Sequence, residues 1–159
     1  MLDRDYENQV CSIARSLEVV GERWSLLIVR NVGLGLNRFE PLRENLGITR
    51  SVLTTRLNTL IEYGILEKRQ YSERPPRFEY HLTAKGRDLA PVLLQLMWWG
   101  DRYYPEENGA PSIATHGGCG GLLDHHLICE KCGEKVEPSD IKVKPGPGRK
   151  TEDLPKIPA

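Results

Sequence analysis

The sequence has no apolar run of the length that a membrane helix needs. None of its hydrophobic stretches approaches ~18 residues. The first ten residues, MLDRDYENQV, are charged and do not contain the apolar segment of a signal peptide. These absences predict a protein that does not span a membrane and that works in a reducing cytoplasm. In that compartment the 4 cysteines are not expected to form structural disulfides.

An excess of charge of either sign is also absent. The 159 residues include 22 Lys and Arg and 22 Asp and Glu, so the formal net charge is zero. Such a balance excludes a polybasic nucleic-acid coat and an acidic tail protein, and any nucleic-acid-binding surface must be local. The length excludes a large multidomain enzyme, because a chain of roughly 100 to 200 residues forms one domain with at most a small appendage.

Catalytic signatures are scarce. The core of the chain, residues 1–104, offers no pocket signature, no glycine-rich phosphate loop and no recognisable Ser/His/Asp motif. A hydrolytic metal site can be imagined from Asp124, His125, His126 and Cys129, but they lie on a short segment that is too small to build a substrate cavity. The sequence therefore predicts that the protein is not an enzyme.

Proline and glycine are sparse in the first two thirds of the chain and dense in the last third. Leu, Val and Ile recur at helical spacing as far as Tyr104, whereas Pro and Gly dominate from Pro105 onward. We predict four parts: a core domain (1–104), a linker (105–115), a small Cys/His nodule (116–141) and a flexible tail (142–159).

The core domain carries the apolar periodicity of helices in its first half. Apolar residues recur every three to four positions, and glycines follow the segments as stop signals. The sequence predicts helices at about 12–20, 22–32, 38–46 and 50–63. Gly47 is the expected C-cap of the third helix, and Thr49 is the expected N-cap of the fourth.

The second half of the core domain changes period. Alternating apolar and polar residues predict a β-hairpin with strands at 65–71 and 78–83 and a turn between them. Thr83 then caps a long helix that runs to about Tyr103. This helix has more apolar surface than one small domain can cover, which indicates a partner chain.

Together these elements predict a mainly α-helical fold with a small β-hairpin wing, a winged helix-turn-helix. In that geometry the fourth helix enters the DNA major groove N-terminus first. The residues of its first turns that lie off the apolar face can all donate hydrogen bonds, and none is acidic. They are Thr49, Arg50, Ser51, Thr54, Thr55 and Arg56. The alternative is an ordinary solvated helix face, although such a face is expected to mix charge signs.

Local charge favours double-stranded DNA as the partner. Between residues 38 and 77 there are eight Lys and Arg against five Glu, a local excess of +3. Arg74 and Arg77 flank two prolines at the hairpin tip, as expected of a wing that lays arginine along a minor groove or phosphates. The alternative is a surface turn with arginines there by chance.

Several separate motifs resemble, in order, the HxlR-type winged helix-turn-helix transcriptional regulators. They are CSIARSLEVVGERWSLLIVRNV, NRFEPLRENLGITRSVLTTRLNTLIEYGILEKRQY and PPRFEYHLTAKGRDLAPVLLQLMWWGDRY, and the resemblance covers about residues 9–104. It implies a dimeric bacterial DNA-binding regulator that is held together through its first and last helices. Such a protein acts as a repressor or an activator near its own operon.

Cys11 stands alone at the start of the first predicted helix. Some members of the resembling family sense quinones, aldehydes or oxidants with a cysteine at this place, and a helix N-terminus favours the reactive thiolate. A small cysteine buried in a dimer interface explains the same residue. Both interpretations remain open from the sequence.

The other cysteines form a separate cluster in the nodule. His116-x2-Cys119 and Cys129-x2-Cys132 are each followed by glycine, which is the two-knuckle spacing of a small zinc ribbon. The spacing predicts one structural Zn²⁺ held by these four residues, with His125 or His126 as a replacement for His116. The alternative is a flexible segment with loose thiols.

The leading hypothesis is a sequence-specific, homodimeric transcriptional regulator on an inverted-repeat operator, with a zinc-binding nodule. The alternative is a winged-helix adaptor for protein contacts, in which the nodule recruits a partner. Function that survives loss of Arg50 and Arg56 would favour the adaptor.

Overall fold

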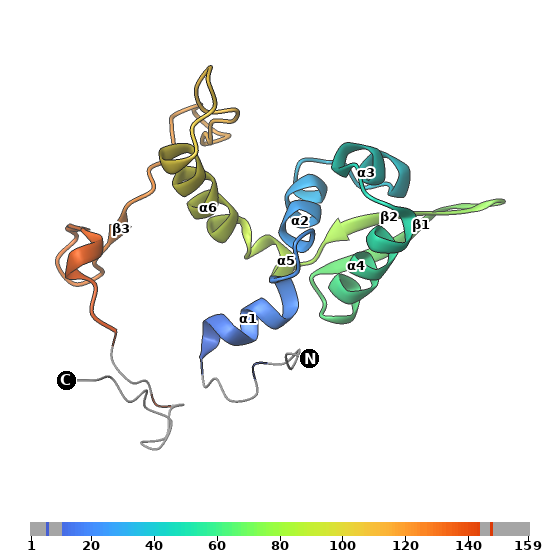
Figure 1. Ribbon diagram of the computed structural model, residues 1–159, viewed down its shortest axis with the longest axis horizontal. Coiled ribbons are helices and arrows are strands. Elements are labelled where there is room, and N and C mark those ends of the chain that lie inside the picture. The colour runs from blue at the N-terminus through green and yellow to red at the C-terminus, as the bar shows by residue number, and fades with distance from the viewer. Residues whose placement is uncertain (1–5, 7–10, 144–146, 148–159) are drawn as a thin grey trace. The chain divides into compact units, whose positions relative to one another are not determined.

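The computed structural model of the protein describes residues 6, 11–143 and 147 (Figure 1). The chain forms two compact units, Met1–Met97 and Trp98–Ala159, and the division between them falls inside the last helix. The composition changes slightly later, at residue 104. Apart from residues 142, 143 and 147, the predicted tail lies outside the described residues.

Within the described residues, the first unit contains four helices followed by a two-stranded antiparallel hairpin, a single helical turn and the start of one further helix. In chain order these are α1 (Ser12–Val20), α2 (Ser25–Gly33), α3 (Phe39–Leu46), α4 (Arg50–Glu62), β1 (Leu66–Glu73), β2 (Pro76–Leu82) and α5 (Ala84–Arg87). Figure 1 shows the hairpin extending away from the helices. The predicted fold class, mainly helical with a hairpin wing, is confirmed.

One apolar cluster joins these elements. Its fully buried apolar side chains come from α2, α3, α4 and the start of β1: Ile28, Val29, Leu42, Leu53, Leu57, Leu60 and Leu66. Burying a leucine or isoleucine side chain contributes about 1.5 to 3 kcal/mol, so this cluster fixes the helices against one another. The predicted second helix begins three residues late, at Ser25, because residues 22–24 form a turn closed by the Ser25 N–H and the Glu22 carbonyl.

The turn between α3 and α4 is closed by the two local signals in its sequence. Gly47 adopts a left-handed conformation with φ of 63°, and its N–H donates to the Glu44 carbonyl. Thr49 Oγ1 then accepts a hydrogen bond from the Val52 N–H at 3.4 Å. A non-glycine residue would be strained at such a φ, so Gly47 ends α3 and Thr49 begins α4 as predicted.

The hairpin is longer than expected. Residues 72–77 were predicted as turn, but β1 continues to Glu73 and β2 begins at Pro76. Pro76 is compatible with a strand because the first residue of a strand need not donate to the ladder. A β-bulge interrupts the register between Gln70 and Ser72, which leaves Tyr71 without a partner on β2.

The prediction of one continuous helix from Thr83 to about Tyr103 is wrong, because the structure has two helices there. The structure has α5, then α6 (Ala90–Tyr103), with a turn at residues 88–89. Pro91 explains the break, since it has no N–H for the Arg87 carbonyl and its ring clashes with that group. None of the helices in the described part of the chain has both the length and the apolar character for crossing a membrane.

Apolar side chains remain exposed on both α1 and α6. Leu89, just before α6, and Leu93 in its first turns pack against the core. Farther around or along α6, Val92, Leu96 and Trp99 are about half exposed. On α1, Ile13 is 71% exposed and Leu17 is 42% exposed. The apolar surplus expected from the sequence is therefore left uncovered in the single chain.

The second unit continues from α6 into β3 (Leu127–Ile128), β4 (Lys135–Val136) and a 3₁₀ turn, η1 (Pro138–Asp140). The two short strands pair antiparallel. Over the described residues of this unit no side chain is fully buried, and Leu122, Leu127 and Ile128 are largely exposed. A segment of this size has too little apolar surface to hold its fold alone.

Candidate nucleic-acid interface

The N-terminal half of α4 presents its polar residues to solvent. Five of the six predicted DNA-binding residues of this region are exposed, and Arg56 is half-buried. Leu53, Leu57 and Leu60 are buried on the opposite side, which determines the orientation of the helix. The exposed residues are Thr49, Arg50, Ser51, Thr54 and Thr55.

The hydroxyl groups on this face are partly engaged in the helix itself. Thr55 Oγ1 donates to the Ser51 carbonyl at 2.9 Å, and the Thr49 and Ser51 hydroxyls lie 3.1 Å apart. Each oxygen keeps lone pairs for an incoming donor. The face therefore offers short polar side chains next to the long arginine at its start.

Arg50, the first residue of α4, is paired with an acid of the preceding helix. Its guanidinium forms an ion pair with Glu40 and lies 5.4 Å from the centroid of the Phe39 ring. The Arg50 side chain is nevertheless 71% exposed. The other carboxylate oxygen of Glu40 accepts from Arg43 Nε at 2.8 Å, and this hydrogen bond lowers the pKa of Glu40.

Arg56 is less accessible than a base-recognising residue is expected to be. Its side chain is 22% exposed, and its guanidinium lies 3.4 Å from Glu22 Oε2. Glu22 belongs to the turn before α2, so this ion pair links α4 to another part of the unit. The two arginines of α4 are thus both matched by a carboxylate.

The wing arginines have a different environment. Arg74 and Arg77 are exposed, and within the described residues neither has a carboxylate partner. The other two cationic side chains of the hairpin already interact with neighbouring groups. Arg69 forms an ion pair with Glu67, and Lys68 lies over the Phe78 ring. The hairpin tip therefore carries two arginines without a carboxylate partner beside one acid, Glu73, and contributes part of the local positive excess predicted from the sequence.

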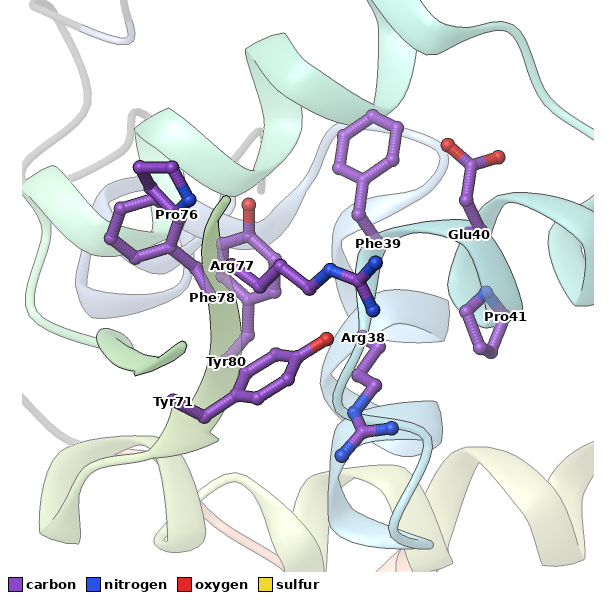
Figure 2. A pocket seen from close by; sticks show the side chains of 9 residues that line it. All are labelled: Arg38, Phe39, Glu40, Pro41, Tyr71, Pro76, Arg77, Phe78 and Tyr80. Atoms are coloured by element: carbon purple, nitrogen blue, oxygen red, sulfur yellow. The ribbon is translucent and has the colours of Figure 1, made fainter. Parts of the chain in front are cut away.

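A pocket of about 490 Å³ lies between the start of α3 and the wing (Figure 2). Arg38 forms an ion pair with Glu79 at 2.8 Å and stacks on the Tyr71 ring, and its hydrogen bond to Glu79 raises its pKa. Arg77 reaches into the same space from β2. No role for Arg38, Glu40 or Tyr71 could be predicted from the sequence, since their contacts join different elements of the chain.

The nodule has two turns with the features expected of metal-binding knuckles. Gly120 and Gly133, which follow Cys119 and Cys132, have φ of 73° and 71°. His116 Nδ1 lies 3.3 Å from Cys119 Sγ. Backbone N–H groups of Cys132 and Lys131 lower the pKa of the Cys129 thiol.

The two predicted ligand pairs, His116 with Cys119 and Cys129 with Cys132, do not surround a common metal position. In the described part of the chain, the group of three ligand atoms within 4.8 Å of one another consists of Asp124, His125 and His126. Lys135 Nζ lies 3.1 Å from Asp124 Oδ2 and 3.3 Å from His126 Nδ1, so an ammonium group already neutralises this cluster. The structure brings His116 next to Cys119, and it does not bring all four predicted ligands together.

Cys11 is the N-cap of α1 and is half-buried. Its carbonyl accepts from the Arg15 N–H at 3.1 Å, whereas its side chain makes no cap hydrogen bond. The thiol is thus placed at the helix N-terminus, as the sequence indicated.

Comparison with known proteins gives consistent matches. The family model described as HxlR-like helix-turn-helix matches residues 19–108. The "uncharacterized HTH-type transcriptional regulator Rv3095" of Mycobacterium tuberculosis is 45% identical over 141 residues, 89% of each chain. This alignment is longer than the predicted core domain, so the similarity extends into the Cys/His nodule.

Solved structures give the same result. PA1607, described as a putative transcription factor, has a TM-score of 0.75 at 31% identity and covers 85% of this chain and 94% of its own. The redox regulator HypR in its oxidized form has a TM-score of 0.54 at 34% identity, with 58% of this chain and 96% of its own covered. The relatives are described as regulators and not as enzymes, in agreement with the prediction. The chain belongs to the HxlR family of helix-turn-helix transcriptional regulators.

Proposed function

We propose that this protein is a homodimeric, sequence-specific DNA-binding regulator that recognises an inverted-repeat operator. In this proposal α4 lies in the major groove and the wing contacts the DNA backbone. The observation that carries it is the combination of an exposed face at the start of α4, whose own residues all donate hydrogen bonds, with two arginines at the hairpin tip that have no carboxylate partner within the described residues.

The two surfaces suit different parts of DNA. Arginine can donate two hydrogen bonds to guanine, and Arg50 sits at the exposed N-terminal end of α4, the end that approaches bases in this geometry. Arg74 and Arg77 lie on a narrow hairpin that extends from the unit, where their charges favour phosphates or a minor groove. Phosphate contacts fix position, and base contacts confer specificity.

The proposed dimer rests on the exposed apolar residues of α1 and α6. Leu17, Leu96 and Trp99 are each between 42% and 54% exposed, and a second copy of the chain can cover them. A two-fold dimer places two recognition helices about 34 Å apart, or a multiple of that, and requires an inverted repeat. Sedimentation at micromolar concentration should give a dimer, and Leu96→Glu should shift it to monomer; a wild-type monomer contradicts this part of the proposal.

We further propose that oxidants or electrophiles act through Cys11. Its position at the N-terminus of α1 supports this, because modification there alters a helix that we assign to the dimer interface. A fold relative, HypR, is described as a redox regulator. Diamide or a quinone should change DNA affinity in the wild type and not in Cys11→Ser. An equal response in both proteins would leave Cys11 with a packing role.

For the nodule we propose one structural Zn²⁺ held by Cys119, Cys129, Cys132 and a histidine, with His116 preferred to His125 or His126. The left-handed glycines after Cys119 and Cys132 and the absence of buried side chains in the described part of this unit support a metal. Elemental analysis of protein purified without added metal should give about one Zn per chain. Less than about half an equivalent, with all three thiols freely titratable, contradicts it.

Selection from a random DNA pool tests the principal proposal. The purified dimer should enrich a sequence with two-fold symmetry whose half-sites are one DNA turn, or a multiple of it, apart. Enrichment of no sequence at ~0.15 M salt, where non-specific attraction is moderated, would contradict the proposal and favour the adaptor alternative.

A further inference from the structure

Glu40 lies between two arginines at the junction of the two helix-turn-helix helices. It belongs to the first turn of α3, and one of its carboxylate oxygens forms the ion pair with Arg50 of α4. Its other oxygen accepts from Arg43 Nε at 2.8 Å. Both oxygens therefore have arginine partners, and the carboxylate connects α3 to the first residue of the recognition helix.

A second contact restrains the same guanidinium. The Arg50 guanidinium lies 5.4 Å from the centroid of the Phe39 ring, within the range of a cation–π interaction. Figure 2 shows the Phe39 and Glu40 side chains projecting to the same side from the start of α3. Arg50 is thus held by an acid and by a ring, while 71% of its side chain stays accessible.

Electrostatic attraction to DNA does not explain why the acid Glu40 lies beside the proposed DNA-binding face. A carboxylate next to a DNA-binding surface repels phosphates, and Glu40 is such a carboxylate; the hydrogen bond from Arg43 lowers its pKa further. Orientation does give a reason. A free arginine loses many rotamers when it forms two hydrogen bonds to a base, and an arginine that is already fixed loses fewer.

We propose that Glu40 is a positioning residue for sequence recognition: supported by Arg43 and Phe39, it holds the Arg50 guanidinium in the orientation that recognises a base. Glu40 then increases discrimination between operator and random DNA although its charge weakens attraction to any DNA. This inference rests on the proposed function, in which Arg50 contacts a base.

Glu40→Gln tests it, with Glu44→Gln as the matched control. Glu44 is on the same helix and is 69% exposed; it lies 3.7 Å from Arg43, and none of the ion pairs among the described residues joins it to Arg50. Both variants remove one negative charge from α3. Dissociation constants are measured for the selected operator and for random DNA of equal length, and thermal unfolding checks that both variants are folded.

Glu44→Gln should bind both DNAs equally or more tightly, by the same factor, so that discrimination is unchanged. Glu40→Gln should lower discrimination by a part of the roughly 5- to 150-fold that one bidentate base contact provides. The loss should fall on the base pair at which Arg50→Ala also loses discrimination. In the Arg50→Ala background, Glu40→Gln should then have no further effect on discrimination.

The outcomes separate the inference from the function on which it rests. If Arg50→Ala loses discrimination and Glu40→Gln behaves like Glu44→Gln, Glu40 only neutralises charge and the inference is wrong. If the wild type has no sequence preference, the proposed function fails as well. Should Glu40→Gln not fold, Arg43→Gln provides the second route, because it removes the support of Glu40 and should cause a smaller loss at the same base pair.

Discussion

The two arginine-bearing surfaces of the first unit, α4 and the hairpin tip, differ in whether their arginines form ion pairs with carboxylates. In α4, Arg50 and Arg56 each face a carboxylate from another segment, Glu40 and Glu22. At the hairpin tip, Arg74 and Arg77 have no such partner within the described residues. Four arginines that look equivalent in the sequence therefore belong to two classes.

From this difference we expect separate tasks for the two surfaces. An unmatched cation on an extended hairpin attracts any phosphate, so it contributes affinity that depends on salt and not on sequence. A matched and oriented cation gains less from phosphate attraction but is suited to a directional contact with a base. We therefore expect α4 to set specificity and the wing to set general affinity.

The largest effect should come from Arg50→Ala. Removing a bidentate base contact should weaken operator binding by roughly 5- to 150-fold, with a much smaller effect on random DNA. Fluorescence anisotropy at ~0.15 M salt measures both affinities. Equal losses on both DNAs would place Arg50 in the same class as the wing arginines and remove the proposed distinction.

The combined variant Arg74→Ala/Arg77→Ala should have the next largest effect. Two phosphate contacts are lost, so the slope of log K against log salt should flatten by about two, and operator and random DNA should weaken by similar factors. The matched control is Lys68→Ala/Arg69→Ala, which removes the same charge from the hairpin before its tip. An equal change of slope in the control would mean that the tip has no special role.

Arg56→Ala should have a smaller effect than Arg50→Ala, although the sequence treats the two residues alike. The Arg56 side chain is only 22% exposed and is paired with Glu22. The variant loses part of a surface ion pair, which contributes about 0 to 1 kcal/mol, and its unfolding midpoint should fall slightly. A loss of discrimination as large as that of Arg50→Ala would show that Arg56 leaves Glu22 to contact a base.

The smallest effect on DNA binding should come from the nodule. Cys129→Ser/Cys132→Ser should release the proposed zinc while unfolding of the first unit stays unchanged, because no proposed ligand belongs to that unit. Calorimetry and elemental analysis measure the two quantities on the same sample. A fall in the unfolding temperature of the winged unit on metal release would contradict this independence.

Features that depend on neighbouring residues were predicted well from the sequence. The bounds of α1 and the caps at Gly47 and Thr49 follow from apolar spacing and from single-residue preferences. The break between α5 and α6 is also local, since Pro91 marks it; the apolar periodicity continues through this point and gives no sign of it. Composition and periodicity thus predicted the fold class, but they did not predict the helix break before Pro91.

Features that depend on distant residues were not predictable. The ion pairs of Arg50 with Glu40 and of Arg56 with Glu22 cross from one element to another, so the sequence showed the residues without their partners. The bulge at Tyr71 has no local sequence signal, and it was missed together with the pocket at the start of α3. The spacing of His116, Cys119, Cys129 and Cys132 predicts a metal site, but spacing alone does not place the two pairs relative to each other.

The most direct test of this division of labour is the ratio of operator affinity to random-DNA affinity. It is measured side by side at ~0.15 M salt for the wild type, Arg50→Ala and Arg74→Ala/Arg77→Ala. We predict that the ratio falls by roughly 5- to 150-fold in Arg50→Ala and stays within experimental error of the wild type in the wing variant. An unchanged ratio in Arg50→Ala, or a collapse of the ratio in the wing variant, would contradict the account.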